Sequence, residues 1–164
     1  MVSRHLNMFL LVMLFSVSGF TEEKSLLCRS DDLDIFYSFC GTGKNTFSFK
    51  VEPCSLKNNS VWKGFMFWIP KADLSVLTGR VSLWFQGSLS LKWNAVLCHG
   101  EDDEYSFCGT LKGETINTTV RISGAQPRYK MGKYIVIFEG FAGHFNNLII
   151  CMNYTFVIKQ NLME

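Results

Sequence analysis

The stretch Ile150-Cys151-Met152-Asn153-Tyr154-Thr155-Phe156 alternates large apolar side chains with smaller or polar ones at every second position. Such alternation is typical of a β-strand with one face toward an apolar interior, because successive side chains of a strand point to opposite faces. Residues 47–52 and 116–122 alternate in the same way, and further strands are expected near residues 33–40, 61–69, 74–86, 89–98 and 133–141. Helical periodicity is almost absent. The sequence therefore predicts an all-β fold, an immunoglobulin-like antiparallel β-sandwich of two sheets.

The N-terminus has the pattern of a secretory signal. Arg4 and His5 precede an apolar run over residues 8–17, and Ser18-Gly19 supplies the small residues that suit a signal peptidase. The run is about half of the roughly 20 apolar residues that a membrane-spanning helix needs, so no membrane span is expected. We expect a signal peptide over residues 1–19, one domain over residues 20–164, and a secreted, extracellular product.

The charged and titratable residues exclude two broad classes of function. The net charge is only +2, so nothing favours binding to nucleic acid. After the expected signal peptide the histidines are His99 and His144, and the acidic residues gather in one run at 101–104. No nucleophile with its base and no separated pair of carboxylates is indicated, so we expect no catalytic residues and no enzyme.

Cysteines and glycosylation signals support an extracellular product. All six cysteines follow the expected signal peptide, and an even count in a secreted chain predicts three disulfides, although the sequence alone leaves about 15 pairings open. Zinc is the rival interpretation, but no C-x-x-C or paired-histidine spacing is present, and we expect no metal and no cofactor. N-glycosylation sequons begin at Asn58, Asn117 and Asn153, and the last two fall on the strand phase opposite the apolar residues, where a glycan would have to be.

The aromatic content raises the question of a filled core or a cavity. The chain has 15 phenylalanines, 4 tryptophans and 5 tyrosines. A well-packed sandwich core is the simpler interpretation. Residues 65–69 and 134–138, however, are apolar on both strand faces, which exceeds what a sandwich with one solvated side requires. This excess favours an apolar cavity between the sheets.

The most specific motif lies between Cys98 and Thr119. Four acidic residues are followed by Tyr105-Ser106-Phe107-Cys108, then by Leu111-Lys112-Gly113-Glu114-Thr115 and Asn117-Thr118-Thr119. This stretch resembles the ML lipid-recognition domain family, in the branch of secreted lipopolysaccharide-binding co-receptors of Toll-like receptor 4. The spacing of the six cysteines also fits, so the resemblance covers the whole chain after the signal peptide.

The resemblance implies disulfide pairs and an acyl-chain cavity. The implied pairs are Cys28 with Cys54, Cys40 with Cys151, and Cys98 with Cys108. The implied lipid-binding residues are Ile35, Phe47, Phe49, Val51, Met66, Trp68, Val81, Phe107, Ile116, Val120, Ile122, Ile150, Met152, Tyr154 and Phe156. The sequence departs from the family at several such positions, where small or polar residues replace apolar or bulky ones: Ser55, Lys57, Gly64, Gly79 and Gly124.

Three surface sites are also implied by the resemblance. A rim for lipid phosphates would comprise Arg121, Ser123, Arg128 and Lys130, although Ala125 and Met131 replace basic residues of the family. A receptor-binding patch would comprise Lys71, Asp102, Asp103, Glu104 and Lys112. A receptor-dimerising edge would comprise Ser88, Ser90 and Tyr129, with the two serines replacing apolar residues.

The expected function is therefore to hold the acyl chains of lipopolysaccharide, through its lipid A or another multi-acyl lipid, and to present them to the Toll-like receptor 4 ectodomain. Burying one chain of about twelve carbons gains near 10 kcal/mol relative to water. Several chains would exceed the ceiling of roughly 18 to 21 kcal/mol for non-covalent affinity, so we expect transfer from a carrier protein, membrane or micelle. Two alternatives remain: a sterol or glycolipid transfer protein of the same fold without receptor activity, and an adhesion sandwich with a filled core.

Overall fold

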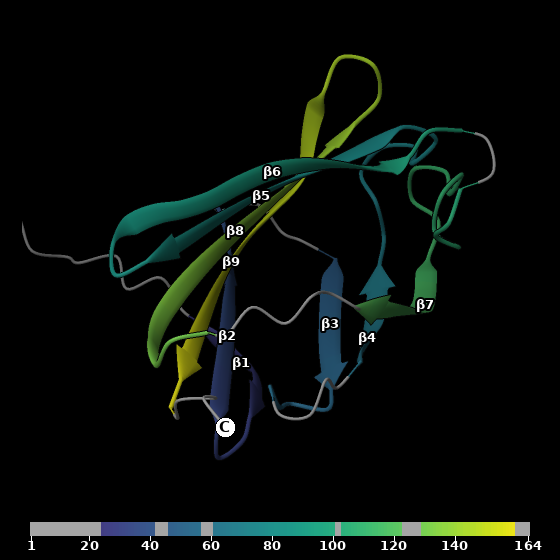
Figure 1. The fold of residues 1–164 in the computed structure, drawn as a ribbon. Helices are drawn as coiled ribbons and strands as arrows, with labels where there is room; N and C mark the ends of the chain where they lie inside the picture. The colour runs from purple at the N-terminus through teal and green to yellow at the C-terminus, as the bar shows by residue number, and fades with distance from the viewer. Residues whose placement is uncertain (1–23, 42–45, 57–60, 101–102, 123–128, 160–164) are drawn as a thin grey trace, which may run out of the picture.

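The computed structural model describes residues 24–41, 46–56, 61–100, 103–122 and 129–159, which form two antiparallel β-sheets. The strands are β1 (Ser25–Arg29), β2 (Leu33–Phe39), β3 (Phe47–Glu52), β4 (Trp62–Trp68), β5 (Leu77–Phe85), β6 (Ser88–Cys98), β7 (Ile116–Ile122), β8 (Gly132–Ala142) and β9 (Asn147–Ile158). One sheet has the order β1-β2-β9-β8-β5-β6 and the other the order β3-β4-β7 (Figure 1). The predicted all-β sandwich is confirmed. The described residues contain no helix long and apolar enough to cross a membrane.

The alternating stretches form strands close to their predicted bounds. Residues 116–122 match β7, residues 47–52 match β3, and residues 150–156 form the central part of β9. The sequence analysis did not predict β1. This strand is only five residues long, and its pairing with β2 is irregular between Leu26 and Cys28, so it carries no alternation to detect.

The three disulfides are the pairs that the resemblance implied. Cys28–Cys54 links β1 to the segment after β3 and thereby connects the two sheets. Cys40–Cys151 links the end of β2 to β9 within the six-stranded sheet, and Cys98–Cys108 links the end of β6 to the loop before β7. No free cysteine is present among the described residues.

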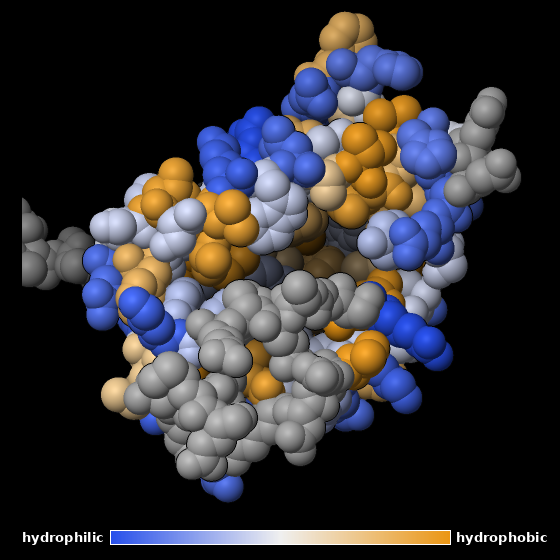
Figure 2. Space-filling view, in the orientation of Figure 1, coloured by the Kyte–Doolittle hydropathy of each residue, from blue (hydrophilic) through white to orange (hydrophobic). Residues whose placement is uncertain are grey.

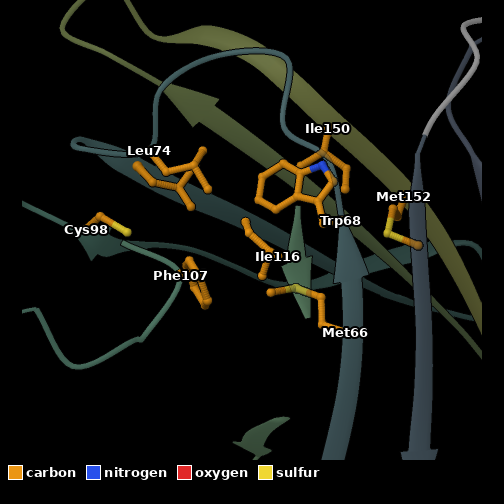
Figure 3. Packing of buried hydrophobic residues seen from close by; sticks show 9 residues of the cluster. Met66, Trp68, Leu74, Cys98, Phe107, Ile116, Ile150 and Met152 are labelled. Carbon is orange, nitrogen blue, oxygen red and sulfur yellow. The ribbon is translucent and has the colours of Figure 1, made fainter. Parts of the chain in front are cut away.

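Buried apolar side chains gather into two clusters at opposite ends of the space between the sheets. In the first, Met66 and Trp68 of β4 pack with Ile116 of β7 and with Ile150 and Met152 of β9 (Figure 3). The second is built from the residues Leu33, Ile35, Val51, Tyr134 and Ile158. The partly buried side chains of Phe49 and Tyr154 contact both clusters, so they span the region in between.

The aromatic residues of β4 point to both sides of the three-stranded sheet. Trp68 and Met66 face the interior, whereas Phe65 and Phe67 lie on the outer face with exposed fractions of 40% and 42%. Their apolar character therefore does not contribute to a cavity, although the sequence analysis used residues 65–69 as an argument for one. In β8, by contrast, apolar residues of the segment 134–138 do line the cavity, since Val136 and Phe138 face inward.

A buried carboxylate connects the sheets beside the Cys28–Cys54 disulfide. Asp32 is 3% exposed and accepts hydrogen bonds from Ser30 Oγ at 2.7 Å, Ser55 Oγ at 3.1 Å and the Leu56 backbone N–H at 2.9 Å. It thus ties the turn before β2 to the segment after β3. Burial alone would raise the pKa of Asp32, but the hydrogen bonds from Ser30, Leu56 and Ser55 outweigh it and hold the pKa below its ordinary value of 3.8.

We expect Asp32 to contribute an acid-sensitive part of the stability. Because its pKa is lower in the folded chain, the unfolded chain takes up the proton first as the pH falls. The contribution is therefore complete above the ordinary value of 3.8 and is lost as the pH falls through the lower pKa of the folded state. Asp32→Asn should reduce the acid dependence of the free energy of unfolding, measured by urea denaturation between about pH 6 and pH 3. Parallel pH profiles for the two proteins would contradict the assignment.

Candidate functional site

A cavity of about 640 Å³ lies between the two sheets. Figure 2 shows the hollow between the layers, with apolar side chains in its depth. Among the residues predicted to bind lipid, the following line it: Ile35, Phe47, Phe49, Val51, Met66, Trp68, Val81, Phe107, Val120, Ile122, Ile150, Met152, Tyr154 and Phe156. Ile116 does not. It is 5% exposed and packs with Met66, Trp68 and Phe107 in the first core cluster, so its placement in the lining is corrected (Figure 3).

Further lining residues were absent from the sequence analysis. They are Leu27, Trp62, Leu77, Leu97, Tyr105, Val136, Phe138 and Gly140, together with Arg121, which was assigned to the rim, and Glu104, which was assigned to the receptor patch. Val136 and Phe138 lie at every second position after Tyr134 in β8, but residues 134–138 are apolar on both faces, so alternation did not distinguish them from Ile135 and Ile137. Leu27 could not be found in this way, because β1 shows no alternation.

The position of Gly64 does not enlarge the cavity. A Cβ atom at Gly64 would collide with the ring of Phe49 and lie 3.0 Å from Val120 Cγ2. Phe49 of β3 therefore occupies the space that a side chain at this position of β4 would take. Gly79 is similarly close to Phe138 and Leu97. At both positions a neighbouring apolar side chain compensates for the glycine.

A smaller space of about 140 Å³ adjoins the main cavity. Trp62, Val136 and Phe156 line both spaces, so the smaller one lies next to the larger. Its other lining residues are Leu56, Leu83, Tyr129, Tyr134 and Ile158. Tyr129, a predicted residue of the dimerising edge, therefore lies against the apolar interior.

Few polar groups reach the cavity. The Tyr154 hydroxyl donates a hydrogen bond to Met152 Sδ at 3.2 Å. Burial, with a smaller effect of Tyr37, raises the pKa of Tyr154 far above its ordinary value, so the hydroxyl stays neutral. Glu104 and Arg121 are exposed and supply charge only where the lining meets solvent. Such a site suits an apolar ligand with its polar group at the edge.

The predicted phosphate rim is only partly described. Arg121 and Lys130 are both exposed, and Arg121 borders the cavity. Ser123 and Arg128 lie outside the described residues. Met131, which replaces a basic residue of the family, is 54% exposed. The described part of this edge therefore combines two cations with an exposed apolar side chain.

The predicted receptor patch is built on a closed loop and two adjoining turns. The Asp103 carboxylate accepts hydrogen bonds from the backbone N–H groups of His99 at 2.8 Å and Gly100 at 3.2 Å, within the loop closed by Cys98–Cys108. The segment holding Lys71 lies beside the one holding Lys112, since the backbone N–H of Gly113 bonds the Pro70 carbonyl at 3.0 Å. Asp102 lies outside the described residues. Asp103 thus has a structural role in the loop that the sequence analysis did not predict.

The predicted dimerising edge lies at the start of β6. Ser88 and Ser90 are exposed, and Ser88 pairs with Phe85, whose ring stacks on Tyr134 at 4.5 Å. Tyr129 contacts the same Tyr134 edge-on at 5.6 Å. The structure therefore brings the three predicted residues to one region.

An apolar shelf beside the cavity was missed by the sequence analysis. Leu91 and Trp93 of β6 are 54% and 43% exposed and pair directly with Leu83 and Val81 of β5. Because directly paired residues share a sheet face, these two side chains continue the lining beyond Val81 toward solvent. β6 is the edge strand of its sheet, which explains why they remain uncovered.

The sequons differ in their surroundings. Asn117 of β7 is exposed. Asn153 of β9 is only partly exposed, and its Oδ1 is enclosed without a hydrogen-bond partner among the described residues. Asn58 lies outside the described residues. The outward strand phase therefore identifies the direction of a side chain but does not ensure that it is open to solvent.

Comparisons with known proteins agree with this architecture. No protein-family model matches the chain. Lymphocyte antigen 96 of Bos taurus is 33% identical over 155 residues, which cover 92% of this chain and 97% of that protein, and the Homo sapiens protein of the same name is 33% identical over 150 residues, covering 90% and 93%. Chicken MD-1, solved in complex with lipid IVa, superposes with a TM-score of 0.73 at 19% identity and covers 84% of this chain and 99% of that structure.

Proposed function

The chain belongs to the lymphocyte antigen 96 family of ML-domain lipid-binding proteins, and from this premise we propose that it is a secreted co-receptor that presents the lipid A part of lipopolysaccharide to Toll-like receptor 4. The observation that carries the proposal is the apolar cavity of about 640 Å³ between the sheets, bordered by charge only at its edge. This arrangement favours a ligand with acyl chains and an anionic or zwitterionic head group. It supports binding without catalysis.

The size of the cavity bears on how a lipid would be held. Its volume of about 640 Å³ has room for on the order of 20 methylene groups, since a methylene group is close in size to a water molecule of about 30 Å³. That is one long acyl chain or two short ones. A lipid with more chains would place the remainder on the shelf formed by Leu91 and Trp93, which continues the lining outward.

The edge of the cavity connects the lipid to the proposed receptor patch. Glu104 both borders the cavity and lies in the loop closed by Cys98–Cys108. The adjoining turn is held by hydrogen bonds from Leu111 N–H to Glu114 Oε2 and from Lys112 N–H to Asp73 Oδ1, both at 2.8 Å. Charges on rigid segments of this kind chiefly set the specificity and rate of association with a partner.

The function is tested by reversing the patch charges while the net charge is kept. Glu104→Lys combined with Lys112→Glu should reduce capture of the Toll-like receptor 4 ectodomain at least tenfold, because like charges would then meet across the interface. Because Glu104 borders the cavity, lipid binding is compared in the single variant Lys112→Glu, from which native mass spectrometry should recover as much acyl lipid as from wild type. The matched control is Arg80→Glu with Glu139→Arg, which exchanges the two charges of a cross-strand ion pair between β5 and β8 and should leave both readouts unchanged.

The outcomes separate the alternatives. Recovery of acyl lipid without receptor capture by the wild type would contradict the co-receptor proposal and leave the lipid-binding part standing. Recovery of a sterol with no acyl lipid would favour a sterol-transfer protein of the same fold. A wild-type protein that carries no lipid and takes up none from micelles would overturn the lipid-binding proposal.

A further inference from the structure

The outer face of the three-stranded sheet exposes a pair of aromatic rings. Phe65 and Phe67 lie on β4, the central strand of that sheet, with 40% and 42% of their surfaces accessible. They do not line either space between the sheets. An apolar pair at the centre of an exposed sheet face indicates a surface that something covers.

The strand register places a glycosylation sequon against this pair. In the pairing of β4 with β7, Asn117 lies directly opposite Phe67, and Thr119 lies directly opposite Phe65. The intervening Thr118 points the other way, and its Oγ1 is 2.8 Å from Ser106 Oγ. Directly opposed residues have Cβ atoms about 4.5 to 5.5 Å apart, so the first sugar on Asn117 would reach the Phe67 ring.

The sequon at Asn153 has neither an exposed asparagine nor an exposed aromatic pair opposite it. Asn153 lies in the interior of the six-stranded sheet between Ser38 and Ile137, and Ser38 is 5% exposed. Thr155, the third residue of that sequon, is 4% exposed. Asn153 itself is only partly exposed, and its Oδ1 is enclosed without a hydrogen-bond partner among the described residues. The two sequons therefore differ in access and also in what a glycan would contact.

Taking the N-linked glycan that the sequence predicts at Asn117 as the premise, we propose that its first N-acetylglucosamine packs on Phe67 and shields Phe65, and that Asn153 is unmodified. In the transfer, Nδ2 of Asn117 bonds to the anomeric carbon of the sugar and loses a proton, while the pyrophosphate of a lipid-linked oligosaccharide leaves. The apolar C–H face of the sugar then removes aromatic surface from water. Since the sugar is already attached, this contact requires no separate association step.

The surroundings of the two rings suit a carbohydrate. In the pairing of β3 with β4, Ser48 lies opposite Phe67 and Lys50 lies opposite Phe65. Ser48 and Lys50 are both exposed. The aromatic pair is thus bordered by hydroxyl and amine groups that can hydrogen-bond sugar hydroxyls. The proposal rests on passage through the secretory pathway and is independent of lipid and receptor binding.

A double-mutant cycle on the secreted full chain tests the contact. The proteins are wild type, Asn117→Gln, Phe65→Thr with Phe67→Thr, and the triple variant, and intact-mass analysis establishes the glycan at each sequon. Loss of the glycan should lower Tm by about 3 °C in the wild-type background, as expected for about 1 kcal/mol in a domain of this size. The same loss should leave Tm unchanged when the two phenylalanines are absent.

Two controls define the contact further. Trimming the glycan enzymatically to a single N-acetylglucosamine should keep the full Tm, because the first sugar makes the contact. Phe145, which is 90% exposed in the β8–β9 loop, supplies the matched aromatic control, and Phe145→Thr should leave the effect of Asn117→Gln intact. An unoccupied Asn117, a glycan on Asn153, or an equal Tm loss with and without the phenylalanines would each overturn the proposal.

Discussion

Replacing Cys40 and Cys151 together with alanine is expected to lower the free energy of unfolding by about 5 kcal/mol, the largest stability effect of any disulfide in the chain. The two cysteines are 111 positions apart, so their bond closes a loop that includes most of the domain. Closing a longer loop removes more conformational entropy from the unfolded chain. Domains of this size are stable by only about 5 to 15 kcal/mol, so we also expect much lower secretion.

The matched comparison is the Cys28–Cys54 disulfide, whose partners are 26 positions apart. Its replacement by two alanines should cost about 3.5 kcal/mol on the same chain-entropy argument. Guanidinium denaturation of the non-reduced proteins measures both losses. A larger loss for Cys28–Cys54 than for Cys40–Cys151 would show that contacts between the sheets, and not loop closure, determine the contribution of these bonds.

Val81→Trp is expected to weaken the binding of acyl lipids about 100-fold or more. Val81 of β5 lines the cavity between the sheets, and the larger ring would occupy the room of roughly four methylene groups of a ligand. At about 0.8 kcal/mol per methylene group this removes about 3 kcal/mol of binding free energy, and each 1.4 kcal/mol is a factor of ten. Displacement of a fluorescent acyl probe measures the affinity.

The control for added bulk is Asn94→Trp. Asn94 is exposed on β6 and pairs with Arg80, whose side chain reaches Glu139 and Phe141 on the outer face of the sheet. The same aromatic group is thereby added on the side away from the cavity, and affinity should not change. If Val81→Trp stays folded by its thermal transition and still binds the probe like wild type, acyl chains do not occupy the cavity near β5.

Residue alternation predicted most of the strands and the direction of their side chains. It succeeded in β3 and β7, because each has one face toward the apolar interior and one toward solvent, and in β9 it gave the inward phase although the opposite face is partly covered. It missed β1, which is short and irregularly paired. It also could not separate a residue that lines the cavity from one that is buried in the core cluster without lining it, as Ile116 shows, since both point inward.

The faces turned away from the interior were less predictable. Phe65 and Phe67 are apolar but exposed, whereas Asn153 is polar but partly enclosed. Alternation reports only the side of the sheet to which a residue points. What covers that side depends on residues distant in the chain.

The sequence by itself determined the all-β class, the phase of the main strands and the number of cysteines available for bonding, because these properties are local or are simple counts. Only the tertiary structure decided that the sheets stand apart around a cavity of about 640 Å³ and that Glu104 and Arg121 both border it. It also decided that Asn117 faces Phe67. The physical reason is that sheet separation and strand register arise from contacts between residues far apart in the chain. The residue pattern along a single strand does not determine these contacts.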